Sequence, residues 1–176
     1  MNETTELIRD GFAHDKTTGK EDWLTPPAIL KHLGKFDLDP CSPTNRPWDT
    51  AKHHFTIEDN GLIKPWGGRV WLNPPYGAQT PKWMQKMATH NGGGIALIFV
   101  RTETKTFFPW IWDYAHSFLF IKGRLSFFTK EGKKGGTAGA PSMLIAYSDV
   151  DGDVLCGCAE SLIPGKYIMN EQVKGV

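Results

Sequence analysis

The feature that most constrains the fold is an uninterrupted apolar segment, Ile95 to Val100, which directly follows three glycines. Six apolar residues in a row are typical of a strand buried on both faces, because a strand with one solvent-facing side alternates apolar and polar residues. Shorter apolar segments at 36–39, 69–72, 117–121 and 143–147 indicate further strands. A sheet covered on both faces needs helices on both sides, so the sequence predicts an α/β fold with a largely parallel sheet.

Two helices are predicted between these strands. Thr25 and Thr80 each precede a proline and an apolar-periodic segment, a pattern typical of an N-cap followed by Pro at the first helical position. A third helix, rich in aromatic residues, is expected over 106–115. Residues 129–140 contain three lysines and four glycines and are predicted to form a flexible basic loop.

Length and composition predict one domain. The 176 residues are enough for a single buried core. Residues 1–20 lack apolar periodicity and are predicted to be a flexible N-terminal arm, followed by one domain over 21–176. No apolar segment approaches the roughly 20 residues that a membrane span requires. The three cysteines have no zinc-ligand spacing and are interpreted as reduced thiols, which favours a cytoplasmic location.

The segment Asn73-Pro74-Pro75-Tyr76, directly after a predicted strand, carries the chemistry. The exocyclic amine of a nucleic-acid base is a poor nucleophile because its lone pair is delocalised into the ring. Two acceptors on its hydrogens raise its reactivity, and the Asn73 side-chain oxygen and the Pro74 carbonyl are suited to this role. Pro75 stiffens the turn, and Tyr76 offers a flat face to a base extruded from the duplex. Displacement at a methylsulfonium needs no metal. The alternative is an ordinary Pro-rich turn.

This motif resembles the catalytic motif of the amino-group DNA methyltransferases, and the wider pattern resembles the phage-type DNA N6-adenine methyltransferases. The matching segments occur in the same order and span roughly residues 22–148: Trp23-Leu24-Thr25-Pro26, Phe36-Asp37-Leu38-Asp39-Pro40, Glu58-Asp59-Asn60-Gly61-Leu62, Val70 to Gly77, Arg101-Thr102-Glu103-Thr104 and Gly123-Arg124-Leu125-Ser126-Phe127. The resemblance implies a Rossmann-like class I methyltransferase fold, with a mostly parallel sheet and an antiparallel last strand. It also implies S-adenosylmethionine as the methyl donor.

The resemblance assigns cofactor roles to residues at predicted strand and helix ends and, for Asp59, in a predicted turn. The set is Thr25, Pro26, Asp39, Cys41, Asp59 and Asn73. Thr25 and Pro26 would border the methionine end, where the N–H groups of a helix start suit a carboxylate. Asp39 would face the cofactor's ammonium group. Pro43 and Asn45 stand where many methyltransferases have glycines, which leaves the contact of this loop with the cofactor open.

The predicted partner is double-stranded DNA with the target base flipped out. Candidate DNA contacts are Arg101, Arg124, Lys130, Lys133 and Lys134, although exposed charges on strand edges and loops have the same appearance in sequence. The net charge of +1 means that DNA contact has to come from a local group of residues. The chain has no large recognition module, so we expect a short recognition site. The oligomeric state is not predicted.

Three alternatives to adenine methylation remain open at this stage. Cytosine N4 and the glutamine amide of a protein present the same lone-pair problem to an Asn-Pro-Pro-Tyr motif. A non-catalytic nucleic-acid-binding relative is the third. The resemblance outside the motif favours DNA adenine, and it predicts a phage- or prophage-encoded enzyme in a bacterial host cell, of the kind found in restriction-modification systems.

Overall fold

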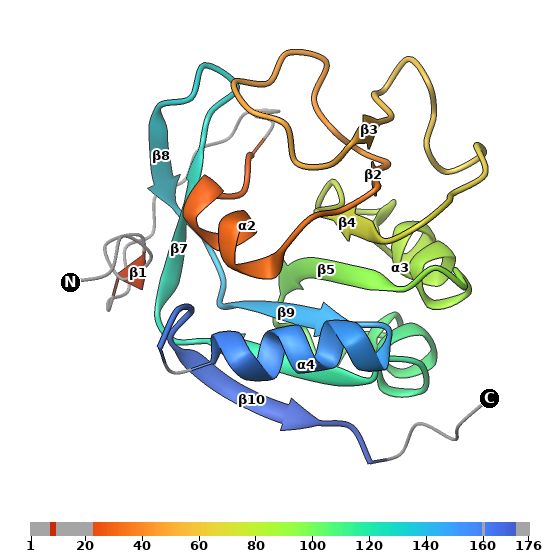
Figure 1. The fold of residues 1–176 in the computed structure, drawn as a ribbon, viewed down its shortest axis with the longest axis vertical. Coiled ribbons are helices and arrows are strands. Elements are labelled where there is room, and N and C mark those ends of the chain that lie inside the picture. The colour runs from red at the N-terminus through yellow and green to blue at the C-terminus, as the bar shows by residue number, and fades with distance from the viewer. Residues whose placement is uncertain (1–7, 10–22, 160, 172–176) are drawn as a thin grey trace.

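The computed structural model describes residues 8–9, 23–159 and 161–171. A seven-stranded sheet with the order β10-β6-β9-β5-β4-β2-β3 forms its centre (Figure 1). Its strands are β2 (Leu38–Asp39), β3 (His53–His54), β4 (Val70–Leu72), β5 (Gly94–Phe99), β6 (Ser117–Ile121), β9 (Ser142–Ala146) and β10 (Gly165–Met169).

The sheet is mainly parallel, as predicted. Strands β3, β2, β4 and β5 pair in parallel, and β9 lies antiparallel between β5 and β6, so β6 runs in the same direction as β5. The prediction of an antiparallel last strand is confirmed: β9, predicted at 143–147, is antiparallel to both of its neighbours, and β10, which the sequence did not predict, also pairs antiparallel with β6. The sequence concealed β10 because an edge strand is half exposed and shows no continuous apolar segment.

Alternate residues of the central strands enter two separate cores. Trp71, Ile95, Leu97 and Leu144 pack with the helices on one face. Their neighbours face the opposite core, and this second set is Val70, Leu72, Ala96, Ile98, Met143 and Ile145. All of these side chains are almost completely buried. The period of two along a strand therefore explains why the segment at 95–98 is apolar at every position.

Helices cover both faces of the sheet, as Figure 1 shows for α4. Helices α2 (Pro27–Leu33) and α4 (Asp149–Cys158) cover one face, and α3 (Thr80–Ala88) and the π-helical turn η1 (Phe108–Trp112) cover the other. The predicted N-caps are wrong. Pro26 and Gln79 occupy these positions, and neither makes a side-chain capping bond. Residue 25 precedes a proline, which disfavours helical backbone there, and the Thr80 hydroxyl binds elsewhere.

A second, smaller sheet has the order β1-β7-β8. It contains β1 (Ile8–Arg9), β7 (Arg124–Phe128) and β8 (Lys134–Thr137). The prediction of a flexible loop over 129–140 is therefore wrong in part, because β8 pairs with β7 as a hairpin despite its glycines. Two residues of the predicted N-terminal arm form β1, and the rest of the arm lies outside the described residues.

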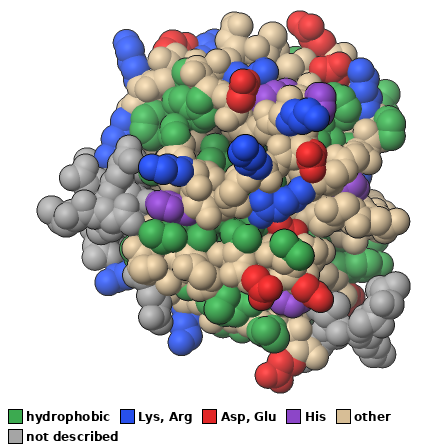
Figure 2. Space-filling model, viewed as in Figure 1, with side chains coloured by type: hydrophobic (Ala, Val, Ile, Leu, Met, Phe, Trp, Pro, Cys, Tyr) green, Lys and Arg blue, Asp and Glu red, His purple; other side chains and the backbone are tan. Residues whose placement is uncertain are grey.

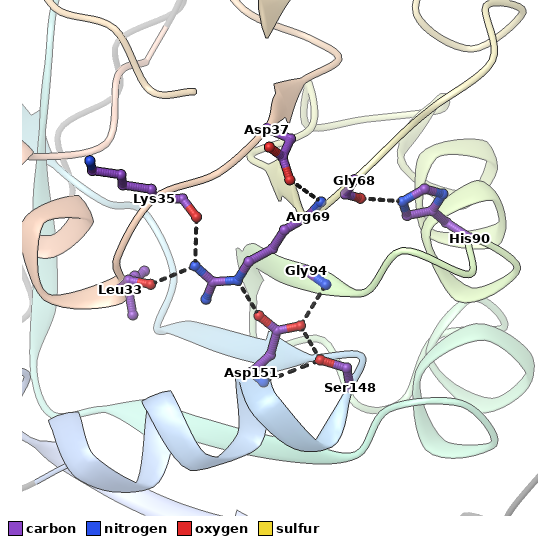
Figure 3. Close-up of polar contacts among 9 residues, drawn as sticks. All are labelled: Leu33, Lys35, Asp37, Gly68, Arg69, His90, Gly94, Ser148 and Asp151. Carbon is purple, nitrogen blue, oxygen red and sulfur yellow. Dashed lines mark hydrogen bonds and ion pairs between the residues drawn. The ribbon is translucent and has the colours of Figure 1, made fainter. Parts of the chain in front are cut away.

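A polar network ties the sheet together at the amino ends of its parallel strands (Figure 3). Arg69, just before β4, donates from Nε to Asp151 at 2.6 Å and from Nη1 to the carbonyls of Leu33 and Lys35 at 2.9 Å. Asp151 also accepts from the Gly94 main-chain N–H at 2.6 Å. One buried carboxylate therefore joins α4 to the starts of β4 and β5.

Two further properties concern the described part of the chain. None of its helices is both long enough and apolar enough to cross a membrane. It also contains no cluster of three or more His, Cys, Asp and Glu side chains arranged to hold a metal ion.

Candidate active site

The predicted catalytic and cofactor segments meet at the carboxyl ends of β2 and β4. These strands are parallel neighbours, so the segments that follow them lie side by side. The Cys41 thiol donates to the Asn73 main-chain carbonyl at 3.2 Å. The Cys41 main-chain N–H donates to Asp39 Oδ1 at 3.1 Å. Cys41 thus connects Asp39, the carboxylate predicted to bind the cofactor, to the predicted catalytic turn at Asn73.

The side chain of Asn73 is held by one of its two polar ends. Its Nδ2 donates to the main-chain carbonyl of Trp23 at 3.0 Å. Its Oδ1 is buried and has no hydrogen-bond partner among the described residues. A buried acceptor without a partner is costly and uncommon in folded proteins. The carboxamide therefore presents an unused acceptor at the carboxyl end of β4, as the predicted chemistry requires.

The ring of Tyr76 is fixed by the end of the next strand. It stacks on Phe99 with a centroid distance of 4.0 Å and an interplanar angle of 12°. Its hydroxyl is also buried and has no partner among the described residues, and burial raises its pKa well above the ordinary value, so it stays protonated. One face of the ring is covered by Phe99, and stacking of a base on the other face remains a prediction. Phe99 was not identified from sequence because it belongs to an apolar strand.

Thr80 holds the turn that contains the two prolines. Its hydroxyl donates to the Pro75 carbonyl at 2.9 Å and accepts from the Gly77 main-chain N–H at 3.0 Å. Gly77 has a φ of 132°, which side-chain-bearing residues rarely adopt. Thr80 therefore joins the start of α3 to the turn after β4. Sequence reasoning assigned the same hydroxyl to helix capping and missed this contact.

Asp39 is a buried carboxyl group at the end of β2. Besides the Cys41 N–H, it accepts from the Thr50 hydroxyl at 2.5 Å. Burial raises the pKa of Asp39 from 3.8 to about 6, although both hydrogen bonds and the nearby Arg46 act in the opposite direction. Ionising such a group at pH 7 costs the fold about 3 kcal/mol. A cationic ligand would stabilise the ionised form, and the Asp39 oxygens have lone pairs left to accept its hydrogen bonds.

Thr25 and Pro26 lie at the start of α2 and are buried. The Thr25 hydroxyl has no hydrogen-bond partner among the described residues. The expected group of free helix N–H donors is reduced here, because neither Pro26 nor Pro27 has an N–H and Ile29 donates to the Pro26 carbonyl at 3.0 Å. The Thr25 hydroxyl and the N–H of Ala28, which has no hydrogen-bond partner among the described residues, therefore support a polar contact at this position.

The turn that carries Asp59 packs against the end of β2. A Cβ at Gly61 would lie 1.9 Å from the Pro40 carbonyl oxygen, so only glycine allows this approach. The Asp59 carboxylate itself accepts from the Thr56 N–H at 2.9 Å and pairs with Lys64 at 2.9 Å, and these contacts lower its pKa. The structure thus brings the turn to the site and engages Asp59 within it. Its contact with the cofactor remains a prediction.

The predicted DNA contacts lie at three separate positions in the fold. Arg101 is exposed just after β5. Arg124 begins β7 and donates from Nη1 to the Ala138 carbonyl at 3.4 Å. Lys130, Lys133 and Lys134 are exposed at the turn of the β7–β8 hairpin. On the face that Figure 2 shows, basic side chains are spread among acidic ones, so the hairpin turn is a local basic group rather than part of a wholly basic surface.

The hairpin turn lies beside the loop that follows β2. Lys130 and Glu131 line an open hollow of about 380 Å³ together with residues 44–47 and Asp49. Asp49 pairs with Arg46 at 3.1 Å and is largely exposed. The structure therefore brings the basic turn to the same edge of the sheet as Asp39.

Unused polar groups at the carboxyl ends of the parallel strands of a covered, mainly parallel sheet are typical of a ligand-binding α/β protein. The family model described as DNA N-6-adenine-methyltransferase (Dam) matches residues 13–155. The chain belongs to this family, and it is therefore a methyltransferase that acts on adenine in DNA. Comparison with curated proteins and with solved structures gave no match.

Proposed function

We propose that the enzyme transfers the methyl group of S-adenosylmethionine to the N6 amino group of an adenine flipped out of double-stranded DNA, at a short recognition site. The observation that carries this proposal is the buried, unpaired Oδ1 of Asn73 beside the rigid Pro74-Pro75 turn. Among the described residues, no hydrogen bond reaches the Pro74 carbonyl either. Two acceptors in one turn match the two hydrogens of the adenine amine.

The residues at the site fit the cofactor by their chemistry. The Asp39 carboxylate suits the cofactor's ammonium group, and the Thr25 hydroxyl and the turn at Asp59 offer further polar contacts. When bound, S-adenosylmethionine would supply an electrophilic methyl carbon for the bond to N6, with the electron pair of the sulfonium C–S bond kept by sulfur and the proton of N6 released to water. With this donor, we interpret the sheet as a Rossmann-like class I methyltransferase fold.

The chain's own groups act on the amine rather than on the methyl group. Asn73 Oδ1 and the Pro74 carbonyl accept its two hydrogens and localise the nitrogen lone pair. Tyr76, held flat by Phe99 and protonated, packs against the base. None of these groups titrates near neutral pH, so positioning and hydrogen bonding supply the rate enhancement.

The basic hairpin turn is proposed to contact the phosphate backbone, and Arg101 and Arg124 to lie at the margin of the DNA. Lys130 lines a hollow together with the loop after β2, and Lys133 and Lys134 follow it in the same hairpin, on the edge of the sheet where the base would enter. A bacterial cytoplasmic location, a phage or prophage gene and a restriction-modification role remain predictions from the resemblance.

Nucleoside mass spectrometry tests the proposal. Purified protein is incubated with S-adenosylmethionine carrying a labelled methyl group and with unmethylated plasmid, and the DNA is digested to nucleosides. We expect labelled N6-methyladenine from the wild type and a loss of about a thousandfold in Asn73→Ala, as for removal of one transition-state hydrogen-bonding group. Asn91→Ala, in an exposed loop, is the matched control. Labelled N4-methylcytosine would overturn the choice of base, and an unlabelled nucleoside pool would overturn the proposal.

A further inference from the structure

We propose that the β7–β8 hairpin positions the catalytic carboxamide of Asn73 through the main-chain carbonyl of Trp23, so that the element expected to contact DNA also sets the geometry of the methyl acceptor site. This inference rests on the proposed function. It adds a positioning role for Trp23 and Gly135, which make no contact with the reacting atoms.

The Trp23 carbonyl selects one of the two orientations of the Asn73 amide. A side-chain amide can rotate by half a turn and exchange its oxygen and nitrogen. A carbonyl can only accept, so it holds Nδ2 at 3.0 Å and leaves Oδ1 on the other side. In the opposite orientation Asn73 Oδ1 would face the Trp23 carbonyl oxygen. The amine of the base would then meet Nδ2, which is a donor like the amine itself. The carbonyl therefore favours the orientation that can activate an amine.

The position of Trp23 depends on the hairpin. Its neighbour Leu24 forms an antiparallel bridge with Phe128 through two main-chain hydrogen bonds, of 2.8 and 3.0 Å. The Trp23 ring lies against Phe127, with 6.3 Å between ring centroids. A Cβ at Gly135 would lie 2.5 Å from Trp23 Cζ3. Strands β7 and β8 thus hold both the main chain and the side chain of the segment that contacts Asn73.

The same hairpin carries the basic turn. The Thr129 N–H donates to the Lys133 carbonyl at 2.8 Å and closes this turn. Lys130 and Lys133 lie within it, only a few residues from Phe128 and Gly135. DNA bound at the turn would therefore act on the β7–β8 hairpin. The hairpin is connected to Asn73 through the Leu24–Phe128 bridge and the hydrogen bond from Asn73 to the Trp23 carbonyl. A displacement of about 1 Å at a reacting group can cost about a hundredfold in rate.

Gly135→Ala tests the connection without altering charge or any reacting group. The backbone at Gly135 does not have a positive φ, so alanine is disfavoured there chiefly by its overlap with the Trp23 ring at 2.5 Å, followed by a tight contact of 3.1 Å with the Phe127 carbonyl oxygen. The matched control is Gly139→Ala, because a Cβ at Gly139 meets no atom within 4 Å. We expect Gly135→Ala to lower kcat by about ten- to a hundredfold at saturating DNA and cofactor. Two dissociation constants should change by less than about threefold. Calorimetry measures the one for S-adenosylmethionine, and fluorescence anisotropy measures the one for a DNA duplex.

Trp23→Phe supplies the rescue. It removes the ring atom that the new Cβ would meet, so the double variant Trp23→Phe/Gly135→Ala should recover most of the lost kcat, which simple unfolding of the hairpin would not allow. Trp23→Ala creates no overlap and replaces Gly135→Ala as the test if that variant fails to fold. It removes the ring that contacts the hairpin, so it should also lower kcat.

The outcomes separate this inference from the proposed function. An active wild type in which Gly135→Ala and Gly139→Ala have the same kcat overturns the positioning role and leaves the methylation of adenine intact. Failure of the double variant to recover kcat also overturns it. A wild type that labels no adenine overturns the proposed function itself.

Discussion

The two ends of the parallel strands each carry a buried carboxylate, and the two carboxylates differ in their hydrogen-bond partners. At the amino ends, Asp151 is surrounded by donors: Arg69 Nε, the Gly94 N–H and the Ser148 hydroxyl (Figure 3). At the carboxyl ends, Asp39 has two neutral donors and no direct ion pair among the described residues. Asp151 is engaged in the fold, whereas Asp39 is left to bind something else.

Buried polar groups without partners lie near both ends of the strands. Asn73 Oδ1, the Thr25 hydroxyl and the Tyr76 hydroxyl are buried without partners near the carboxyl ends. At the amino ends, His116 Nδ1, the Ser117 hydroxyl and Arg69 Nη2 are buried without partners among the described residues, although the other two guanidinium nitrogens of Arg69 make hydrogen bonds. The two edges of the sheet therefore differ in their carboxylates: Asp151 is paired with Arg69, whereas Asp39 has no direct ion pair among the described residues.

The largest effect is expected from Asp151→Ala. It leaves the Arg69 guanidinium mostly buried beside an unsatisfied Gly94 N–H, so we expect a loss of about 3 kcal/mol in the free energy of unfolding, measured with urea. The kcat of the protein that remains folded should stay within about twofold, or about 0.4 kcal/mol. Asp153→Ala, on an exposed position of α4, is the control and should change stability by less than about 0.5 kcal/mol. Equal stability of the two variants would remove the basis of the comparison.

Asp39→Asn should affect binding rather than stability. Loss of a charged hydrogen-bond acceptor should weaken the affinity for S-adenosylmethionine by roughly ten- to a hundredfold at pH 7.5, measured by calorimetry. Unfolding should not become easier, because the raised pKa means that ionised Asp39 destabilises the fold as pH rises from 3.8 through about 6. The Asn side chain can still reach the Cys41 N–H and the Thr50 hydroxyl.

The pH dependence of cofactor binding sharpens this test. With a pKa of about 6, wild-type Asp39 is ionised at pH 7.5 and becomes protonated as the pH falls below 6. Affinity for a cationic ligand should therefore fall with decreasing pH through this range, and the Asn variant should show no such dependence. A wild-type affinity that stays constant from pH 7.5 to 5.5 would contradict the assignment.

Replacement of Lys130, Lys133 and Lys134 by Ala should have a moderate effect that depends on salt. Each phosphate contact contributes about 0.9 to the slope of log K against log salt concentration, so the slope should fall by about 2 to 3. Fluorescence anisotropy with a DNA duplex measures this slope. Lys166→Ala, on the edge strand β10, is the control and should leave it unchanged. An unaltered slope in the triple variant would show that the basic turn does not meet DNA.

Thr80→Val should have the smallest effect. It keeps the shape of the side chain and removes the hydroxyl that holds Pro75 and Gly77, so we expect a loss of about 1 kcal/mol in stability and about fivefold in kcat. Thr80→Ser keeps the hydroxyl and should behave like the wild type. If Val and Ser variants are equally active, the clamp on the turn has no role in the reaction.

The sequence alone determined the elements whose signal is local. Continuous apolar segments gave β4, β5, β6 and β9 within a residue or two, because a strand buried on both faces must be apolar at each position. The motif at 73–76 and the carboxyl group of Asp39 were located at strand ends for the same reason. Family membership confirms the adenine methyltransferase class that the motifs predicted.

Only the tertiary structure decided which polar groups are used and which are left open. Trp23 acts through a main-chain carbonyl, so its side chain carries no sequence signal for that contact. The Thr80 hydroxyl had two possible partners, a helix end and the Pro75 carbonyl, and the packing of α3 beside the turn selected the second. Asp39 and Asp151 are the same residue type in sequence. Arg69 forms a direct ion pair with Asp151 and makes that carboxylate part of the scaffold. Asp39 has no direct ion pair among the described residues and stays available to a ligand.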